Sequence, residues 1–340
     1  MGVELKEALF YEKKENDVAL CRLCHHHCRI GDGAGGLCGV RENRAGILSS
    51  MVYGRTVAEH IDPIEKKPLF HFLPSSTSYS ISTVGCNFRC RHCQNYEISQ
   101  YPHVADVESI GRQRSPESIV DAAVAGACRS ISYTYVEPTI FYEFAYDCAI
   151  LAHQRGLKNV FVSNGYMGTE VAKSMAGVID GVNIDIKAFT EEFYHQVCGA
   201  KLAPVLENVQ LLHDLGLWLE ITTLVIPGWN DSDAELREIA GFIKGVDANI
   251  PWHVTAFHPT YKMLDRAPTQ AASLRRAMDI GFEEGLRFVY CGNIPDSGGE
   301  STHCPACQSL LVDRHGFKAV SSLLEGHCHT CGESIVGVWK

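Results

Sequence analysis

The sequence predicts an α/β protein built on a partial (β/α)6 TIM-like barrel, with a cysteine-rich block before the barrel and a cysteine-rich tail after it. Two observations indicate this class. Runs of β-favouring residues alternate with helical patterns through the body of the chain, and each predicted strand is followed at once by a polar or glycine-bearing motif. The 340 residues, 46% of them hydrophobic, can fill one large core with small appendages. We expect an N-terminal segment with a linking arm at 1–77, the barrel at 78–300 and a four-cysteine domain at 301–340.

Six runs rich in β-branched and aromatic residues are predicted to be strands, at 78–83, 130–135, 158–163, 181–186, 218–225 and 252–256. Five helical patterns lie between or after them, at 139–155, 169–176, 204–215, 232–243 and 269–284. This alternation predicts a parallel sheet with right-handed crossovers. A doubly wound sheet would also fit, but motifs at the ends of many strands at once favour a barrel. The tract 61–76 is interpreted as the linking arm.

Composition restricts the class of protein. Fifteen cysteines gathered in C-x2-C and C-x3-C groups, in a chain of enzyme length, favour metal binding in a reducing compartment over a disulfide scaffold. No apolar run is long enough to span a membrane, and residues 1–16 are charged, so a cytoplasmic location is expected. The net charge of -10 argues against a large nucleic-acid footprint.

The most informative motif is the C-x3-C-x2-C group of Cys86, Cys90 and Cys93. Three thiolates can hold three corners of a cubane [4Fe–4S] cluster, and no fourth cysteine follows closely in sequence. One iron would then stay open to a ligand, unlike the irons of an electron-transfer cluster with four cysteines. A zinc loop is the alternative interpretation.

This spacing resembles that of the radical S-adenosylmethionine (SAM) superfamily. The chain as a whole resembles the branch that includes the pyruvate formate-lyase activating enzyme and, more closely, the AmmeMemoRadiSam family. The resemblance extends over nearly the whole chain, through Cys21 to Cys28, 36–43, the cysteine loop, 133–139, 159–166, 185–189, 257–259 and the tail cysteines.

The resemblance implies that the open iron binds SAM. One electron from the cluster then cleaves SAM to methionine and a 5′-deoxyadenosyl radical, which abstracts hydrogen from a substrate that the sequence does not identify. An external one-electron reductant, a ferredoxin or flavodoxin, is implied as a partner. So are the two protein families after which the AmmeMemoRadiSam family is named.

The same resemblance places seven residues at the SAM site: His92, Glu137, Ser163, Asn164, Asp185, Lys187 and His258. Ordinary structural roles are open for most of them. Glu137 with Pro138 could begin a helix, Asn164 with Gly165 could form a turn, and His258 could be a surface or core residue. Asp185 and Lys187, two apart on a strand and so on one face, could form a purely structural ion pair.

Two further cysteine groups flank the barrel. Cys304, Cys307, Cys328 and Cys331 form two C-x2-C knuckles, which predict a four-thiolate site for zinc or, less often, a rubredoxin-like iron. Cys21, Cys24, Cys28 and Cys38, with His25, His26 and His27 as alternative ligands, could hold zinc or an auxiliary [4Fe–4S] cluster, and a structural metal site is slightly preferred. The remaining four cysteines, Cys198 among them, are assigned no chemistry.

Three functions are therefore open. The favoured one is a radical SAM enzyme acting on a small molecule or on a substrate presented by its partner families. The second is an activase that abstracts hydrogen from the backbone of a glycyl-radical enzyme, which would need an open barrel mouth. The third, from another class, is a metal-binding scaffold without catalysis.

Overall fold

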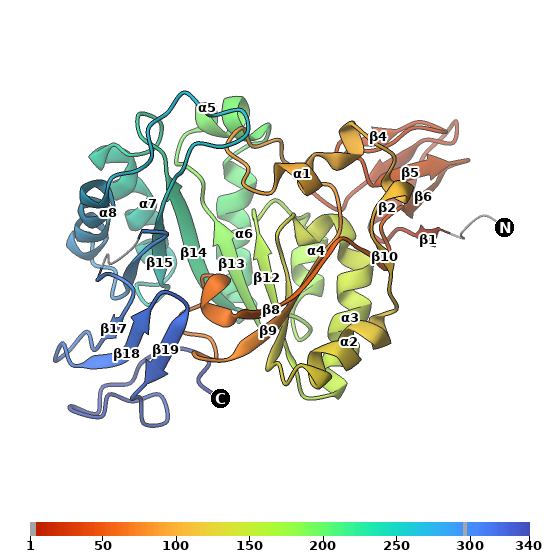
Figure 1. Ribbon diagram of the computed structural model, residues 1–340. Coiled ribbons are helices and arrows are strands. Elements are labelled where there is room, and N and C mark those ends of the chain that lie inside the picture. The colour runs from red at the N-terminus through yellow and green to blue at the C-terminus, as the bar shows by residue number, and fades with distance from the viewer. Residues whose placement is uncertain (1–4, 295–297) are drawn as a thin grey trace.

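An eight-stranded sheet forms the body of the computed structural model, which describes residues 5–294 and 298–340 (Figure 1). Seven of its strands are parallel to their neighbours, and β8 joins β9 in antiparallel pairing at one edge. The strand order is β16-β15-β14-β13-β12-β11-β9-β8, so β16 and β8 are its two edges. The bounds are β8 Ala58–Pro63, β9 Thr77–Ser82, β11 Ser130–Tyr133, β12 Lys158–Ser163, β13 Gly181–Asp185, β14 Trp218–Val225, β15 Trp252–Ala256 and β16 Val289–Gly292.

All six predicted strands are present, but the sheet has eight strands instead of the six that were predicted. β16 adds a seventh parallel strand, and β8 occupies part of the tract interpreted as a linking arm. β16 is only four residues long, too short for a clear pattern. β8 is a partly exposed edge strand that carries Glu59, His60 and Asp62, so it lacks the apolar run of its buried neighbours.

Helices follow most of the parallel strands and cover the sheet (Figure 1). Local sequence explains how several begin: Ser115 caps α2, with Pro116 at its first position, and Ser232 caps α7 by accepting from Glu235 N. The α-helices are α1 Tyr96–Ser99, α2 Pro116–Ala125, α3 Tyr142–Gln154, α4 Thr169–Ser174, α5 Glu191–Phe193, α6 Ala203–Asp214, α7 Asp233–Val246 and α8 Ala271–Glu283. Short 3-10 turns are η1 Ile64–Lys66, η2 Tyr101–His103, η3 Val107–Ser109 and η4 Pro138–Phe141, and η5 Tyr194–Cys198 is a π-helix.

Close packing of α8 on the sheet depends on one glycine. A Cβ atom on Gly281 would lie 2.8 Å from Val289 and 3.1 Å from the Trp252 ring. Because such distances are shorter than van der Waals contact, a larger residue would push α8 away from β15 and β16. The buried apolar faces of these elements hold the edge of the barrel together.

The N-terminal residues form small antiparallel sheets at one end of the molecule (Figure 1). A buried ion pair, 2.6 Å between Arg41 Nη2 and Glu143 Oε2, ties this block to α3. Removing one partner of such a pair typically costs about 3–5 kcal/mol. The strands are β1 Lys6–Glu7, β2 Tyr11–Lys13, β3 Ala19–Cys21, β4 Arg29–Ile30, β5 Arg41–Arg44 and β6 Ile47–Ser50, and β7 Arg55–Thr56 pairs with β10 Arg112–Gln113.

The tail lies at the other end of the molecule and is a three-stranded antiparallel sheet (Figure 1). Its strands are β17 Thr302–His303, β18 Leu310–His315 and β19 Lys318–Ser321. Leu311 and Val312 of the tail share a small apolar cluster with Phe70 and Phe288. The tail is therefore packed on the barrel through a core of its own.

A buried polar network joins the tail to the barrel at the amino-terminal ends of the parallel strands. Glu220, on β14, accepts hydrogen bonds from the backbone N–H groups of Phe70 (2.8 Å) and His71 (2.7 Å) and from His253 Nε2 (2.6 Å). Arg314 of the tail donates to the carbonyl oxygen of Phe70 (2.6 Å). Because these hydrogen bonds satisfy the buried carboxylate of Glu220, this charged side chain is tolerated inside the interface.

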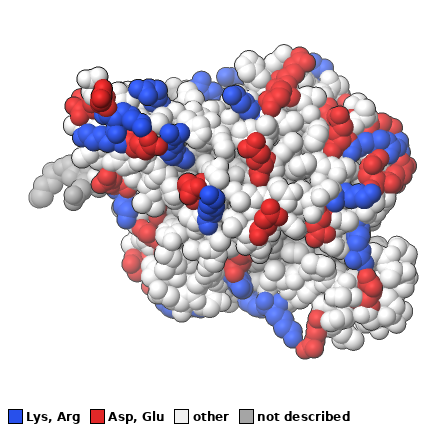
Figure 2. Space-filling view, turned by 180° about the vertical axis from the view of Figure 1, so that it is seen from behind, with Lys and Arg blue, Asp and Glu red and all other residues white. Residues whose placement is uncertain are grey.

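The surface shows mixed charge. On the face drawn in Figure 2, basic and acidic side chains are interspersed rather than gathered by sign. Among the helices of residues 5–294 and 298–340, none combines the length and the apolar character needed to cross a bilayer.

Candidate active site and metal centres

The loop that carries Cys86, Cys90 and Cys93 lies between β9 and α1, at the carboxyl end of the sheet. Cys90 is buried and the other two are partly buried. Phe88 N lies 3.4 Å from Cys86 Sγ, and Cys93 Sγ lies 3.3 Å from Ser99 Oγ. The three thiols are thus held on one short loop with polar groups directed at their sulfurs.

The π-helix η5 is hydrogen-bonded to this loop through backbone groups. Arg89 N donates to the carbonyl oxygen of Cys198 (2.8 Å), and Arg91 N donates to that of Val197 (3.0 Å). The side chains of Cys198 and Cys90 lie close enough that each thiol shifts the pKa of the other. Sequence reasoning assigned Cys198 no chemistry, because a single cysteine in a helical stretch gives no local signal. π-helical turns of this kind are frequent at functional sites.

Glu137 organises the neighbouring strand ends. Its Oε1 accepts from Thr139 N (3.1 Å) and Ser163 Oγ (2.8 Å), and its Oε2 accepts from Asn164 N (2.7 Å). Burial raises the pKa of Glu137, and its charge in turn adds to the raised pKa of Cys86, so the two groups are close. Glu137 also caps η4, with Pro138 following it, so the helix-initiating role expected as an alternative is present.

Asn87 is a site residue that sequence reasoning missed. Its Oδ1 accepts from Asn164 Nδ2 (2.8 Å), which joins the cysteine loop to the end of β12. Its Nδ2 is buried and has no partner among the described residues. A buried amide donor of this kind is costly unless a ligand accepts from it.

Lys187 and Asp185 stand together at the end of β13, with 2.9 Å between Lys187 Nζ and Asp185 Oδ2. Burial opposes the charge of Lys187, but the charges of Asp185 and Cys90 hold its pKa well above the ordinary value. The Lys187 charge also contributes to the lowered pKa of Cys90 and of His92. The ion pair therefore faces the cysteine loop.

The two histidines expected at the site differ in placement. His92 is buried, its Nδ1 has no partner among the described residues, and burial lowers its pKa to about 3, so the ring is neutral. His258 is exposed, and its Nε2 lies 3.4 Å from the carbonyl oxygen of Asn293 at the end of β16. His92 therefore lies near Lys187 and the cysteine loop, whereas the contact of His258 with Asn293 lies at the end of β16.

The residues around the cysteine loop fit an iron–sulfur cluster with a bound SAM molecule. The three thiols can bind iron, and the positive charge of Lys187 favours a negatively charged ligand beside them. The buried nitrogens of Asn87 and His92 have no partner among the described residues and would be satisfied by a ligand rich in acceptors. When bound, the cluster supplies the electron for reductive cleavage of SAM.

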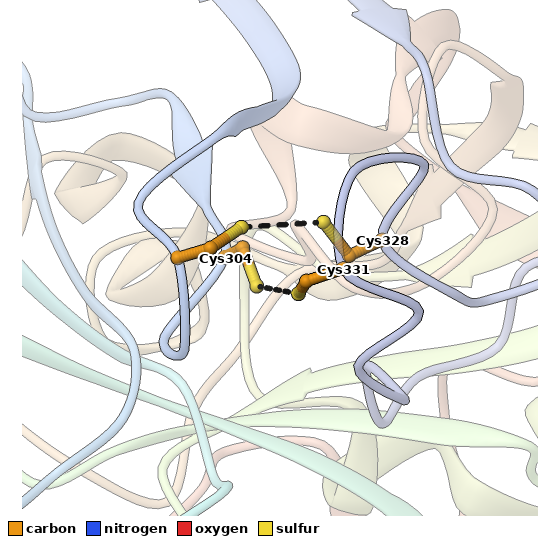
Figure 3. A group of neighbouring side chains, drawn as sticks. Cys304, Cys328 and Cys331 are labelled. Carbon is orange, nitrogen blue, oxygen red and sulfur yellow. Dashed lines mark hydrogen bonds between the residues drawn. The ribbon is translucent and has the colours of Figure 1, made fainter.

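The tail cysteines form a second centre. Cys304, Cys307, Cys328 and Cys331 have all four sulfurs within 4.8 Å of one another, with 3.6 Å for two of the pairs (Figure 3). Figure 3 shows the sulfurs of the two knuckles pointing toward each other. A tetrahedral ion with Zn–S bonds of about 2.3 Å sets its sulfurs about 3.8 Å apart, so the group has the size of a single metal ion.

Comparison with known proteins identifies the family. Residues 80–240 match the model of the radical SAM superfamily. Over 335 residues the chain is 44% identical to an uncharacterized protein of Methanocaldococcus jannaschii, covering 97% of this chain and 99% of that one. It is also 21% identical over 222 residues to the pyruvate formate-lyase 1-activating enzyme of Escherichia coli, covering 61% and 89% of the two chains.

A solved structure shows the same fold. Streptococcus suis SuiB bound to S-adenosylmethionine matches with a TM-score of 0.51 at 13% identity, covering 69% of this chain and 53% of that one. At this identity the match supports the fold alone.

The parallel sheet and the cysteine loop at its carboxyl edge define a radical SAM enzyme, and the chain belongs to the radical SAM superfamily. It acts with a [4Fe–4S] cluster, SAM and a one-electron reductant, and it has glycyl-radical activating enzymes among its relatives. The predictions of an enzyme and of this class of reaction are confirmed, which leaves the scaffold alternative without support.

Proposed function

We propose that Cys86, Cys90 and Cys93 hold the cluster and that SAM lies between it and the carboxyl ends of the strands. The observation that carries this assignment is the convergence of three strand ends on the cysteine loop, through Asn164 with Asn87, Glu137 beside Cys86, and Lys187 beside Cys90. Groups that follow different parallel strands meet at the carboxyl end of the sheet, which is where barrel enzymes have their active sites.

The residues around the cysteine loop have separate roles in this proposal. Lys187 neutralises negative charge beside the thiolates, and Asp185 holds its ammonium group in place. Glu137 fixes Ser163 and Asn164, and the lone pair that remains on its Oε2 can accept from the SAM amino group. His92, a buried neutral ring with an unpartnered Nδ1 among the described residues, would contact the adenine. His258 would contact the SAM carboxylate from the end of β15.

For the substrate we propose a small molecule, or a group presented by the two partner families of the AmmeMemoRadiSam system. The resemblance of the whole chain to that family supports this choice. A glycyl-radical activase is the second candidate, supported by the activating enzyme among the relatives. A glycyl radical on a candidate partner, detected by electron paramagnetic resonance (EPR), would select the activase.

The outer parts of the chain complete the proposal. We infer that the tail group binds zinc, since its sulfur spacing has the size of a single ion. Division at 77/78 and 300/301 is proposed as the domain organisation, although β8 of the first segment completes the sheet of the second. All fifteen cysteines are free thiols, which suits a reducing cytoplasm.

The decisive experiment is anaerobic reconstitution with iron and sulfide, followed by dithionite and SAM, with 5′-deoxyadenosine measured by chromatography. The unaltered chain forms 5′-deoxyadenosine and Cys90→Ala forms none. Cys128→Ala, which removes a buried cysteine before β11, is the matched control and keeps the activity. Formation by Cys90→Ala equal to that of the control would refute the cluster assignment.

A further inference from the structure

The four N-terminal cysteines form one group, although they are spread over two loops. Cys21 N donates to the carbonyl oxygen of Cys28 (2.9 Å) across the hairpin of β3 and β4, and Cys24 lies in its turn. A Cβ atom on Gly36 would lie 3.4 Å from Ile30 and 3.8 Å from Cys38 Sγ, so Cys38 faces β4. Each of Cys21, Cys24 and Cys38 has its pKa raised in part by others of the four thiols, as expected for groups that lie near one another.

Their sulfurs are farther apart than those of the tail. Within residues 5–294 and 298–340, the tail is the only set of three or more His, Cys, Asp or Glu residues whose ligand atoms all lie within 4.8 Å. The N-terminal thiols therefore converge without reaching the spacing that one tetrahedral ion requires. A cubane cluster places its own irons and sulfides between the cysteine sulfurs, so its ligands stand farther apart than those of a single ion.

Arg41 is a second, independent sign of a ligand. It is 1% exposed, and its Nη2 is occupied by Glu143, but its Nε and Nη1 have no partner among the described residues. Its positive charge acts on both Cys21 and Cys38. Buried donors of a guanidinium need acceptors, and the sulfurs of a negatively charged cluster supply them.

The block lies directly against the catalytic cysteine loop. Gly85, which precedes Cys86, has a positive φ of 95°, and a Cβ atom there would lie 2.9 Å from the carbonyl oxygen of Cys38. His26 Nε2, between Cys24 and Cys28, lies 2.7 Å from the carbonyl oxygen of Asn87. The two groups of cysteines are thus joined by direct packing and by a hydrogen bond.

We propose that Cys21, Cys24, Cys28 and Cys38 bind an auxiliary [4Fe–4S] cluster that passes electrons to the cluster held by Cys86, Cys90 and Cys93. One electron enters from a flavodoxin or ferredoxin and one leaves for the catalytic cluster, so the auxiliary cluster returns to its starting state. The electron-transfer part rests on the proposed function, whereas the binding part does not. This assignment replaces the structural metal site that the sequence slightly favoured.

The binding part is tested by counting acid-labile sulfide, because a single zinc or iron ion in the tail carries none. The triple variant Cys86→Ala, Cys90→Ala, Cys93→Ala should retain about four sulfides per full-length chain and, when reduced, an EPR signal. Adding Cys28→Ser, the least buried of the four cysteines, should remove both, whereas adding Cys128→Ala should remove neither. No sulfide in the triple variant, with X-ray absorption showing zinc and no iron–iron distance, would overturn the assignment.

The electron-transfer part is tested by comparing donors with the single variant Cys28→Ser. Its loss of 5′-deoxyadenosine formation should be about tenfold greater with reduced flavodoxin than with dithionite, a small reductant that can reach the catalytic cluster directly. Equal losses with the two donors would overturn the relay. An unaltered chain that keeps its sulfide but forms no 5′-deoxyadenosine would refute the proposed function and leave the binding assignment intact.

Discussion

The N-terminal and C-terminal cysteine groups have the same four thiols but differ in spacing and in what they contact. The tail sulfurs are already at the distance that one ion needs, and their domain packs against the barrel at the amino-terminal ends of the parallel strands. The N-terminal sulfurs are more widely spaced, and their loops contact the cysteine loop at the opposite end. In barrel enzymes the amino-terminal ends of the strands generally serve stability, whereas the carboxyl-terminal ends carry the active site. The comparison therefore agrees with the proposals that the tail serves stability and that the N-terminal block serves electron supply.

Removal of the tail metal should have the largest effect on stability. Cys328→Ser should lose one equivalent of bound metal and lower the melting temperature by about 8 °C or more, because the small tail sheet depends on its ion. Metal analysis and thermal unfolding measure this, with Cys128→Ala as the control that keeps the metal. An unchanged metal count would remove the tail site from the comparison.

Glu220→Gln should cost about 3 kcal/mol of unfolding free energy, since the neutral amide cannot satisfy the donors of Phe70, His71 and His253 together. Urea unfolding followed by circular dichroism gives the value. The exposed Glu207→Gln is the matched control and should stay within about 0.5 kcal/mol of the unaltered chain. Equal stability of the two variants would show that the tail interface does not depend on this carboxylate.

Acid should weaken the tail interface through His71. Its Nδ1 donates to the carbonyl oxygen of Val336 (2.9 Å) and its Nε2 accepts from Tyr290 (2.6 Å), so the ring is neutral, and burial lowers its pKa to about 4. The stabilisation is therefore complete above about pH 6.5, the unfolded value, and is lost as the pH falls toward 4, by about 3 kcal/mol in total.

The measurement for His71 is the pH dependence of urea unfolding between pH 7 and 4. His71→Gln should be less stable at neutral pH and should lose less stability than the unaltered chain over this interval. Parallel curves for the two proteins would place the acid sensitivity elsewhere in the interface.

The smallest expected effect concerns the contact between the N-terminal block and the cysteine loop. His26→Ala removes the 2.7 Å hydrogen bond to Asn87 and should slow 5′-deoxyadenosine formation about tenfold, equivalent to about 1.4 kcal/mol. His27→Asn is the control, because His27 is exposed and asparagine accepts its left-handed backbone. Equal rates for the two variants would mean that the block does not orient the loop.

Sequence alone determined six of the parallel strands and their order along the chain, and three of them have the predicted bounds. These features follow from the local alternation of apolar and polar residues, which any window of sequence contains. The spacing of Cys86, Cys90 and Cys93 was likewise a local pattern. The edge strands β8 and β16 escaped prediction because short or half-exposed segments have no such pattern.

Tertiary structure decided everything that depends on residues far apart in the chain. Packing produces the closeness of Cys198 to Cys90, the unpartnered nitrogens of Asn87 and Arg41, and the different sulfur spacings of the two outer groups. The cysteine motifs in the sequence show how many thiols are available to bind a metal or a cluster. The distance between their sulfurs, which decides between one ion and a cluster, depends on how the loops that carry them are held by the rest of the fold.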